Sequence, residues 1–277
     1  MQVTFGVFIV RSLIFVVLAF FALIAVLPLV YMLVSSMKTS TEFFVNPLGV
    51  PSVWNFENYR ALFIRFDLVR LYGNTIICAL GALLLTLLLS VPASYAFAKL
   101  RFRFRSALFI GMIATMTIPG ITFIIPNYLI MSKLGLIDSY LSVILMWGVI
   151  SVPGNSFLLT SLMRGLPDET LEAVKMDGAN YFQLMFLIVL PLSIPGIVTV
   201  SIFCLTGWWN DLLTPLLYLQ TDSMKTLTVA TATILGRFGD DFPLLLSGLV
   251  LVSVPPVLLY VFLQGYIRKG LVVGAVK

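Results

Sequence analysis

Four of the twelve acidic residues in this 277-residue chain lie within ten positions of one another. They are Asp168, Glu169, Glu172 and Asp177, and they stand between two long apolar segments in a chain of which only 10% of the residues are charged. A lipid span does not tolerate carboxylates at this density, so this stretch must face water. The chemistry that such a cluster suits is polar contact with a partner outside the membrane.

The remaining sequence offers little for catalysis. Histidine, the commonest general base and metal ligand, does not occur. The two cysteines, Cys78 and Cys204, both fall in apolar segments, which excludes a disulfide framework and a zinc site. We therefore predict no catalytic residue, no metal site and no enzyme activity.

The residues around the acidic cluster predict a short helix between Pro167 and Gly178. Proline suits a first helical turn, acids in that turn oppose the positive helix end, and glycine suits a left-handed stop. Leu171 and Val174 share a small apolar face, while Glu172 projects elsewhere. Capping and charge alone leave two interpretations open, a plain connector or a docking helix.

The spacing downstream adds a longer pattern: Glu172-Ala173-Val174, three residues, Gly178, nine residues, then Ile188-Val189-Leu190-Pro191. Residues 164–191 thereby resemble the EAA loop of ABC importer permeases, with Val174 where that family usually has its second alanine. The resemblance implies a coupling helix that docks on a separate ATPase subunit through Leu171, Glu172, Ala173, Val174, Asp177 and Gly178.

Composition places the chain in the membrane class, since 60% of its residues are apolar and its mean hydropathy is +1.07. Spans that can cross a hydrocarbon core of ~30 Å are predicted at residues 12–34, 73–98, 107–131, 140–163, 185–207 and 243–266. We predict an all-α membrane protein with six transmembrane helices. The resemblance implies a type I ABC importer permease bundle, with residues 73–277 as its core domain.

Three local features refine this arrangement. Residues 1–72 form the first span and an outer-surface segment, in which residues 56–71 predict an amphipathic helix. The second span is rich in small residues, which favours close packing inside a bundle. Pro119, Gly120 and Pro126 interrupt the third span, and this break either borders a pathway or is an ordinary kink.

The distribution of Lys and Arg predicts which side of the membrane each loop occupies. The two termini, residues 99–105 and residues 164–184 hold ten Lys and Arg, against seven in the longer opposite loops. By the positive-inside rule both termini and the acidic helix are cytoplasmic. Because the Lys and Arg residues lie between the predicted spans and at the termini, the net charge of +5 does not indicate a nucleic-acid partner.

The chain lacks the means to drive transport alone. It contains no G-x-x-x-x-G-K-[ST] phosphate loop, and its predicted span interiors contain essentially no ionisable residue of the kind that couples ion gradients. An external motor is therefore expected. Further segments, among them WNDLLTPLLYL and the ending QGYIRKGLVVGAVK, resemble the carbohydrate branch of ABC permeases of the maltose permease G type.

This wider resemblance implies a set of partners and contact residues. The partners are a second, different permease, two ATPase subunits that hold ATP and Mg²⁺, an extracytoplasmic solute-binding protein, and membrane lipid. No cofactor is expected in this chain itself. An outer loop would reach the binding protein through Gly236, Arg237, Phe238 and Gly239, and the tail from Arg268 to Lys277 would reach the ATPase.

Trp208, Asn210 and Asp211 form a second candidate site. Aromatic faces beside hydrogen-bonding groups suit sugar recognition along a pathway. Tryptophan at a membrane boundary is also an ordinary interfacial anchor, and this second interpretation is favoured.

Taken together, the sequence predicts a sugar or oligosaccharide permease of an ATP-driven importer in a bacterial or archaeal plasma (inner) membrane. The alternatives are the same machine for a glycerol phosphate or a polyol, and a self-sufficient secondary carrier. The sequence does not identify the sugar or the partner subunits.

Overall fold

A computed structural model describes residues 2–234, 236, 239 and 241–275. Within these residues the regular elements are helices, and no strand occurs among them. The all-α prediction is therefore confirmed.

Two compact units make up the chain, and each is described by itself. One unit combines Met1–Leu68 with Thr231–Val254, and the other combines Val69–Ala230 with Pro255–Lys277. The division at residue 72 expected from the sequence stays a prediction.

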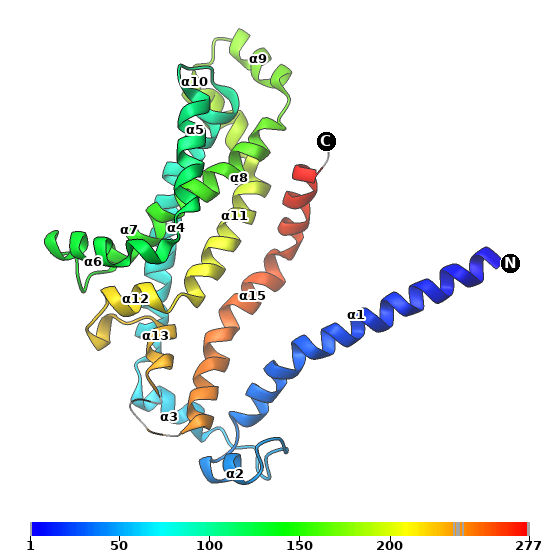
Figure 1. The fold of residues 1–277 in the computed structure, drawn as a ribbon, viewed down its shortest axis with the longest axis vertical. Coiled ribbons are helices and arrows are strands. Elements are labelled where there is room, and N and C mark those ends of the chain that lie inside the picture. The colour runs from blue at the N-terminus through cyan, green and yellow to red at the C-terminus, as the bar shows by residue number, and fades with distance from the viewer. Residues whose placement is uncertain (1, 235, 237–238, 240, 276–277) are drawn as a thin grey trace. The chain divides into compact units, whose positions relative to one another are not determined.

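The first unit contains α1 (Gln2–Ser35), α2 (Ser40–Val45), α3 (Glu57–Arg65) and the beginning of α15 (Phe242–Ala275). Figure 1 shows α1 as one long uninterrupted helix. Its part from Val10 to Ser35 is apolar enough to span a membrane and buries almost nothing inside the structure, as a helix facing lipid would. In the segment after α1, the ammonium of Lys38 is buried and donates to the carbonyls of Asn46 at 2.9 Å and Pro47 at 3.0 Å.

The amphipathic helix expected over residues 56–71 is shorter than the sequence predicted. It ends at Arg65 because Phe66 is extended, with ψ of 136°, and a new helix begins at Leu68. The apolar periodicity continues across this break, so periodicity alone could not locate it. Aspartate is favoured at the position just before a helix begins. Asp67 is therefore the residue that indicates the start of the next helix at Leu68.

The second unit begins with α4 (Leu68–Lys99), α5 (Arg105–Ala114), η1 (Thr115–Thr117), η2 (Gly120–Phe123) and α6 (Ile124–Lys133). It continues with α7 (Tyr140–Ile150), α8 (Val152–Arg164), α9 (Asp168–Met176), α10 (Tyr181–Leu184), η3 (Met185–Val189) and α11 (Leu190–Asn210). After these come α12 (Leu213–Tyr218), η4 (Asp222–Met224), α13 (Leu227–Ala232) and the end of α15. Figure 1 shows α9 at one end of this unit, and α6 and α12 away from that end.

Six spans result if each of two bent helix pairs counts as one. Among the described residues, four helices are long and apolar enough to cross a membrane by themselves. The pair Arg105–Thr117 and Gly120–Lys133 bends by 88°, and the pair Tyr140–Ile150 and Val152–Arg164 bends by 42°. The sequence predicted the first break at Pro119 and Gly120, but it missed the second. Pro126 lies in the first turn of α6 and does not break it.

Small residues hold α4 against α7 and α8, as the sequence predicted. The Thr86 hydroxyl donates to the Gly148 carbonyl at 3.0 Å, and the Ser94 hydroxyl donates to the Ser156 carbonyl at 3.1 Å. A Cβ added at Gly148 would lie 2.8 Å from the side chain of Leu85, so a larger residue there would push the helices apart. Close approach of this kind is how helices associate where lipid supplies no hydrophobic drive.

Polar contacts connect the other end of α4 to distant parts of the second unit. The Asn74 amide donates to the carbonyls of Ser223 and Lys225 at 2.9 and 2.8 Å, and its oxygen accepts from the Tyr140 hydroxyl at 2.6 Å. The carboxylate of Asp138 accepts from the backbone amides of Gln220 and Thr221, both at 2.9 Å. These bonds connect the segment after α12 to α4 and to the loop before α7.

Candidate functional site

The acidic helix forms as predicted. α9 starts after Pro167, whose φ and ψ of −60° and 126° place it just before the helix, and Gly178 follows the helix at φ +88°. That left-handed conformation is readily available only to glycine, which is why the helix stops there. The acids of the first turn are Asp168 and Glu169, and Lys175 lies in the last turn.

One face of α9 packs on the second unit, and the opposite face is open. Leu171 and Val174 are half-buried against the hydrophobic core, whereas Glu172 and Ala173 are exposed and Met176 is 87% exposed. Successive residues of an α-helix are rotated by about 100° around its axis. Glu169, Glu172, Ala173 and Met176 therefore lie on the side of α9 opposite Leu171 and Val174, which is the open face. Asp177 and Gly178 are exposed at the helix end.

A lysine at the end of α4 anchors α9. The ammonium of Lys99 donates to the Asp168 carboxylate at 2.6 Å and to the Leu166 carbonyl at 2.6 Å. The lysine side chain is only 6% exposed, so it lies against the unit and not in bulk water. This hydrogen bond, with the Lys99 charge and a smaller effect of Arg101, holds the pKa of Asp168 below its ordinary value.

Replacing Lys99 by methionine should loosen α9 without unfolding the bundle. Because the pKa of Asp168 is lowered in the folded chain, the contact stabilises α9 above the ordinary carboxyl pKa and is lost as pH falls through the lowered value. We expect faster amide exchange across residues 167–178 in Lys99→Met at neutral pH. After correction for the intrinsic pH dependence of amide exchange, acidification should lower the protection of these amides in the wild type and have less effect in the variant. Lys133→Met, at an exposed lysine of α6, is the control, and equal exchange in all three proteins would contradict the anchoring role.

A groove of about 920 Å³ lies beside α9. Its walls come from the end of α4, the loop after it and the first residue of α5, and from α9 and α10. The charged groups in its lining are Lys99, Arg101, Arg105, Asp168, Glu172 and Lys175. Both signs of charge are therefore available to a partner that docks here, and the basic loop and the acidic helix predicted separately from the sequence form one surface.

The rest of the motif shapes the start of the fifth span. Asn180 and Gln183 form a capping box at the start of α10, and the π-helical turn η3 follows at Met185–Val189. Pro191 has no N–H, and its ring would clash with the carbonyl four residues earlier in a regular α-helix. The wide turn of η3 is the kind of local adjustment that admits such a proline. The fifth span therefore runs from Tyr181 to Asn210.

The two bent helix pairs border a common cavity of about 700 Å³, together with α11. Its polar lining comprises Thr115, Asn127, Ser151 and Asn155. Its aromatic lining comprises Phe123, Phe203 and Trp208. The break in the third span therefore borders a cavity. In the fourth span, Pro153 removes a backbone donor near the bend at Ser151.

Of the second group of predicted residues, only Trp208 lines this cavity. It is 7% exposed and stacks on Trp147, with ring centroids 5.9 Å apart and planes inclined by 7°. The Trp147 indole N–H donates to the Asp211 carboxylate at 2.7 Å, and the other Asp211 oxygen accepts from the backbone N–H of Leu213 at 2.9 Å. Asp211 thus holds the tryptophan pair and the start of α12.

Asn210 is exposed, and its amide donates to the Thr206 carbonyl one helical turn earlier at 2.8 Å. The sequence did not predict Asn127, Ser151 and Asn155 as cavity-lining residues, because only charged residues within the spans were taken as candidates. Uncharged amides within apolar spans were the available signal, since polar groups there are retained mainly for packing or function.

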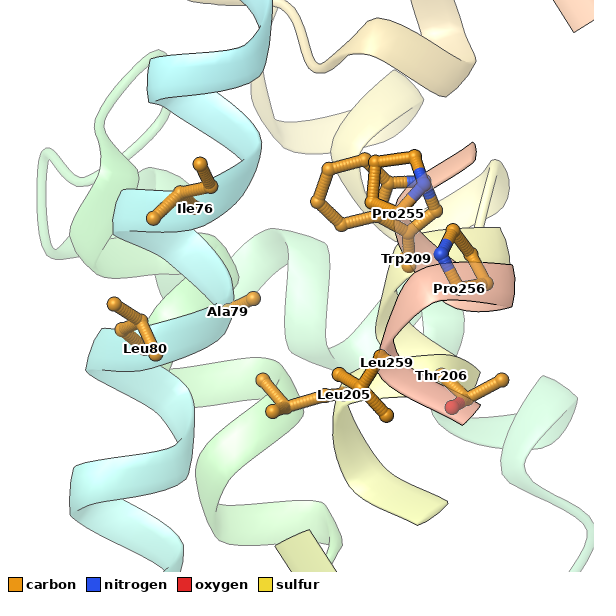
Figure 2. A pocket seen from close by; sticks show the side chains of 9 residues that line it. All are labelled: Ile76, Ala79, Leu80, Leu205, Thr206, Trp209, Pro255, Pro256 and Leu259. Carbon is orange, nitrogen blue, oxygen red and sulfur yellow. The ribbon is translucent and has the colours of Figure 1, made fainter. Parts of the chain in front are cut away.

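A second cavity, of about 170 Å³, is almost entirely apolar. Figure 2 shows its lining, which comes from α4 (Ile76, Ala79, Leu80), α11 (Leu205, Thr206, Trp209) and α15 (Pro255, Pro256, Leu259). Thr206 supplies its only side-chain hydroxyl. This lining offers few hydrogen bonds for recognising a polar solute.

The loop predicted to contact the binding protein is only partly described. Gly236 is helical and Gly239 has φ of +69°. Arg237 and Phe238 lie outside the described residues, so the geometry of this contact stays a prediction. Among the described residues, no group of three His, Cys, Asp or Glu side chains could hold a metal ion.

Known proteins match most of this chain. The family described as binding-protein-dependent transport system inner membrane component matches residues 87–273. The arabinooligosaccharides transport system permease protein AraQ of Halalkalibacterium halodurans is 34% identical over 263 residues, covering 94% of each chain. The sulfoquinovosyl glycerol transport system permease protein SmoH of Agrobacterium fabrum is 31% identical, covering 90% of this chain and 88% of that one.

A solved structure shows the same fold. A chain of a bacterial ABC transporter involved in the import of the acidic polysaccharide alginate superposes with a TM-score of 0.80, at 23% identity, covering 93% of this chain and 96% of that one. The predicted type I importer bundle is thereby confirmed at the level of the fold.

Proposed function

Since this chain belongs to the family of binding-protein-dependent transport system inner membrane components, we propose that it imports a sugar or an oligosaccharide as one permease subunit of an ABC transporter. It is a transport subunit of the inner membrane and not an enzyme. Membership of this family implies that it works with an ATPase and a solute-binding protein. A second, different permease would complete the pathway.

The observation that carries the proposal is the geometry of α9. Leu171 and Val174 fasten this helix to the bundle, the Lys99 ammonium fixes its first turn, and its open face presents Glu169, Glu172, Ala173 and Met176. A rigid polar helix between two spans is suited to transmit movement between an ATPase and a membrane bundle. The ATPase subunits, which would hold ATP and Mg²⁺, would dock on this face and on the groove beside it.

The same proposal assigns sides. The basic loop at residues 99–105 shares a groove with α9, so the positive-inside rule favours a cytoplasmic α9 and cytoplasmic termini. The segment containing Gly236, Arg237, Phe238 and Gly239 would then face the binding protein. In this arrangement Leu171 and Val174 position the coupling helix, while Glu172, Ala173, Asp177 and Gly178 lie where the ATPase can reach them.

Reconstitution of the whole importer tests this function. The chain is co-expressed with its partner permease, ATPase and binding protein, placed in proteoliposomes, and supplied with radiolabelled arabinotriose or glycerol phosphate. We expect arabinotriose uptake that requires both ATP and the binding protein. Preferred uptake of glycerol phosphate would favour the alternative cargo. Uptake by the isolated chain without ATP would show a secondary carrier and overturn the proposal.

A further inference from the structure

The cavity between the two bent helix pairs is lined by residues of this chain. Its volume of about 700 Å³ falls within the range of ~300–1,000 Å³ that small-molecule sites occupy. The bends of 88° and 42° interrupt two neighbouring spans at its wall. Non-helical backbone at membrane depth is tolerated where it lines a water-filled cavity or is covered by protein, and both breaks line a cavity here.

The lining of this cavity is mostly apolar, it includes a few polar groups, and it carries no charge. It combines two amides, two hydroxyls and three aromatic rings, and none of its lining residues carries a carboxylate, an ammonium or a guanidinium. The nearest predicted candidate with a charge, Asp211, does not line the cavity, and its oxygens accept from Trp147, Leu213 and Thr214. No charge in this lining can offset the desolvation of an anion.

Two of the lining groups are held in place by neighbours. The Asn155 amide donates to the Cys204 thiol sulfur at 3.1 Å, which leaves the Asn155 oxygen without a partner among the described residues and open to accept from a hydroxyl. The Trp208 ring is fixed by its stack on Trp147. A fixed amide and a fixed ring face can bind sugar hydroxyls and C–H surfaces with little ordering of side chains.

We propose that Asn155, Asn127 and Trp208 form a solute-contacting wall of this subunit, and that this wall selects neutral polyhydroxylated solutes over anionic ones. This inference rests on the proposed import function. It adds which solute charge is accepted and which residues discriminate it. A phosphate or carboxylate pressed against the wall would lose hydration without gaining a cation, which is costly, whereas a neutral sugar exchanges its water hydrogen bonds for amide ones.

The first test measures uptake in the reconstituted importer. Asn155→Leu keeps the side-chain volume but removes both amide functions, and we expect uptake of arabinotriose to fall about tenfold, the factor that one lost hydrogen bond to a hydroxyl gives. Stimulation of ATP hydrolysis by the loaded binding protein should persist. The matched control is Thr206→Val, a polar-to-apolar change on α11 in the apolar cavity of Figure 2, which should leave uptake unchanged. Uptake by Asn155→Leu at the wild-type rate would contradict the proposal that this wall contacts the solute.

The second test needs no transport. Ser151→Cys places a thiol at the bend of the fourth span, and its labelling by an uncharged maleimide is followed in the intact importer. Native Cys78 and Cys204 are buried, and because Cys204 lines the same cavity, labelling of the wild-type chain is measured with each solute and subtracted. Arabinotriose or cellobiose should slow labelling severalfold, whereas glycerol phosphate and galacturonate should not.

The two tests separate the wall from the import function. If the vesicles import nothing, the proposed function fails. The labelling experiment alone then tests whether the wall contacts the solute. Equal protection by charged solutes, or no protection by either neutral sugar, would contradict the inference. Labelling of Ser151→Cys in the isolated chain but not in the assembled importer would also contradict the inference. In that case a partner subunit would cover the cavity.

Discussion

Replacing Glu172 by lysine is expected to lower sugar uptake at least about tenfold, while the ATPase subunits continue to hydrolyse ATP, because a misplaced charge at a docking surface costs several kcal/mol. Glu172 lies on the open face of α9, away from the half-buried Leu171 and Val174. A lysine there reverses the charge offered to the ATPase without disturbing the packing of the helix on the bundle. Coupling should fail while the fold remains.

Three measurements on Glu172→Lys separate these effects. They are uptake in proteoliposomes, ATP hydrolysis by the same vesicles, and co-purification of the ATPase with the permease. The matched control is Glu57→Lys, the same charge reversal at an exposed glutamate of α3. Full coupling in Glu172→Lys would show that α9 is only a connector. Loss of function in Glu57→Lys as well would point to a general effect of charge.

Replacing Asp211 by asparagine should destabilise the second unit by about 2–3 kcal/mol, the value of hydrogen bonds made to a charged acceptor. Asp211 accepts from the Trp147 indole N–H and, through its other oxygen, from the backbone of Leu213 and Thr214. An amide has one acceptor oxygen only, so asparagine must set its own NH₂ against a donor in either orientation. Trp147 is 4% exposed and has little access to water in compensation.

Thermal unfolding of the purified importer, followed by tryptophan fluorescence, measures this effect. The chain contains four tryptophans, of which two form the stack beside Asp211. Asp222→Asn is the control, because Asp222 is 63% exposed and its ion pair with Lys225 is a surface contact worth about 0–1 kcal/mol. If Asp211 were instead a solute contact, Asp211→Asn would reduce uptake at an unchanged unfolding temperature.

Some parts of the molecule follow from short-range sequence alone. Pro167, two first-turn acids and Gly178 define α9 within a residue, because caps and left-handed stops depend on local backbone chemistry. Long apolar runs define the spans, because a span must exclude charge over a fixed length. The end of the amphipathic helix at Arg65 was predicted wrongly, since the apolar pattern runs on into α4 while the backbone turns at Phe66.

The tertiary structure decided which side chains meet. Lys99 and Asp168 are 69 residues apart in the chain, and nothing in the pattern of either segment indicates that one anchors the other. Trp147 and Asp211 are separated by 64 residues, and their hydrogen bond gives Asp211 a contact with the tryptophan pair that the sequence did not indicate. Such pairs arise from helix packing, which depends on the whole bundle.

The sequence by itself determined the membrane class, the acidic helix and the need for an external motor, because composition, caps and charge exclusion act over a few residues. Only the tertiary structure decided that the breaks at Pro119 and Ser151 border one cavity with α11, and that its wall bears Asn127 and Asn155. The physical reason is that a cavity is the space between helices. Its lining is therefore set by how separate segments bend and pack, which no single segment encodes.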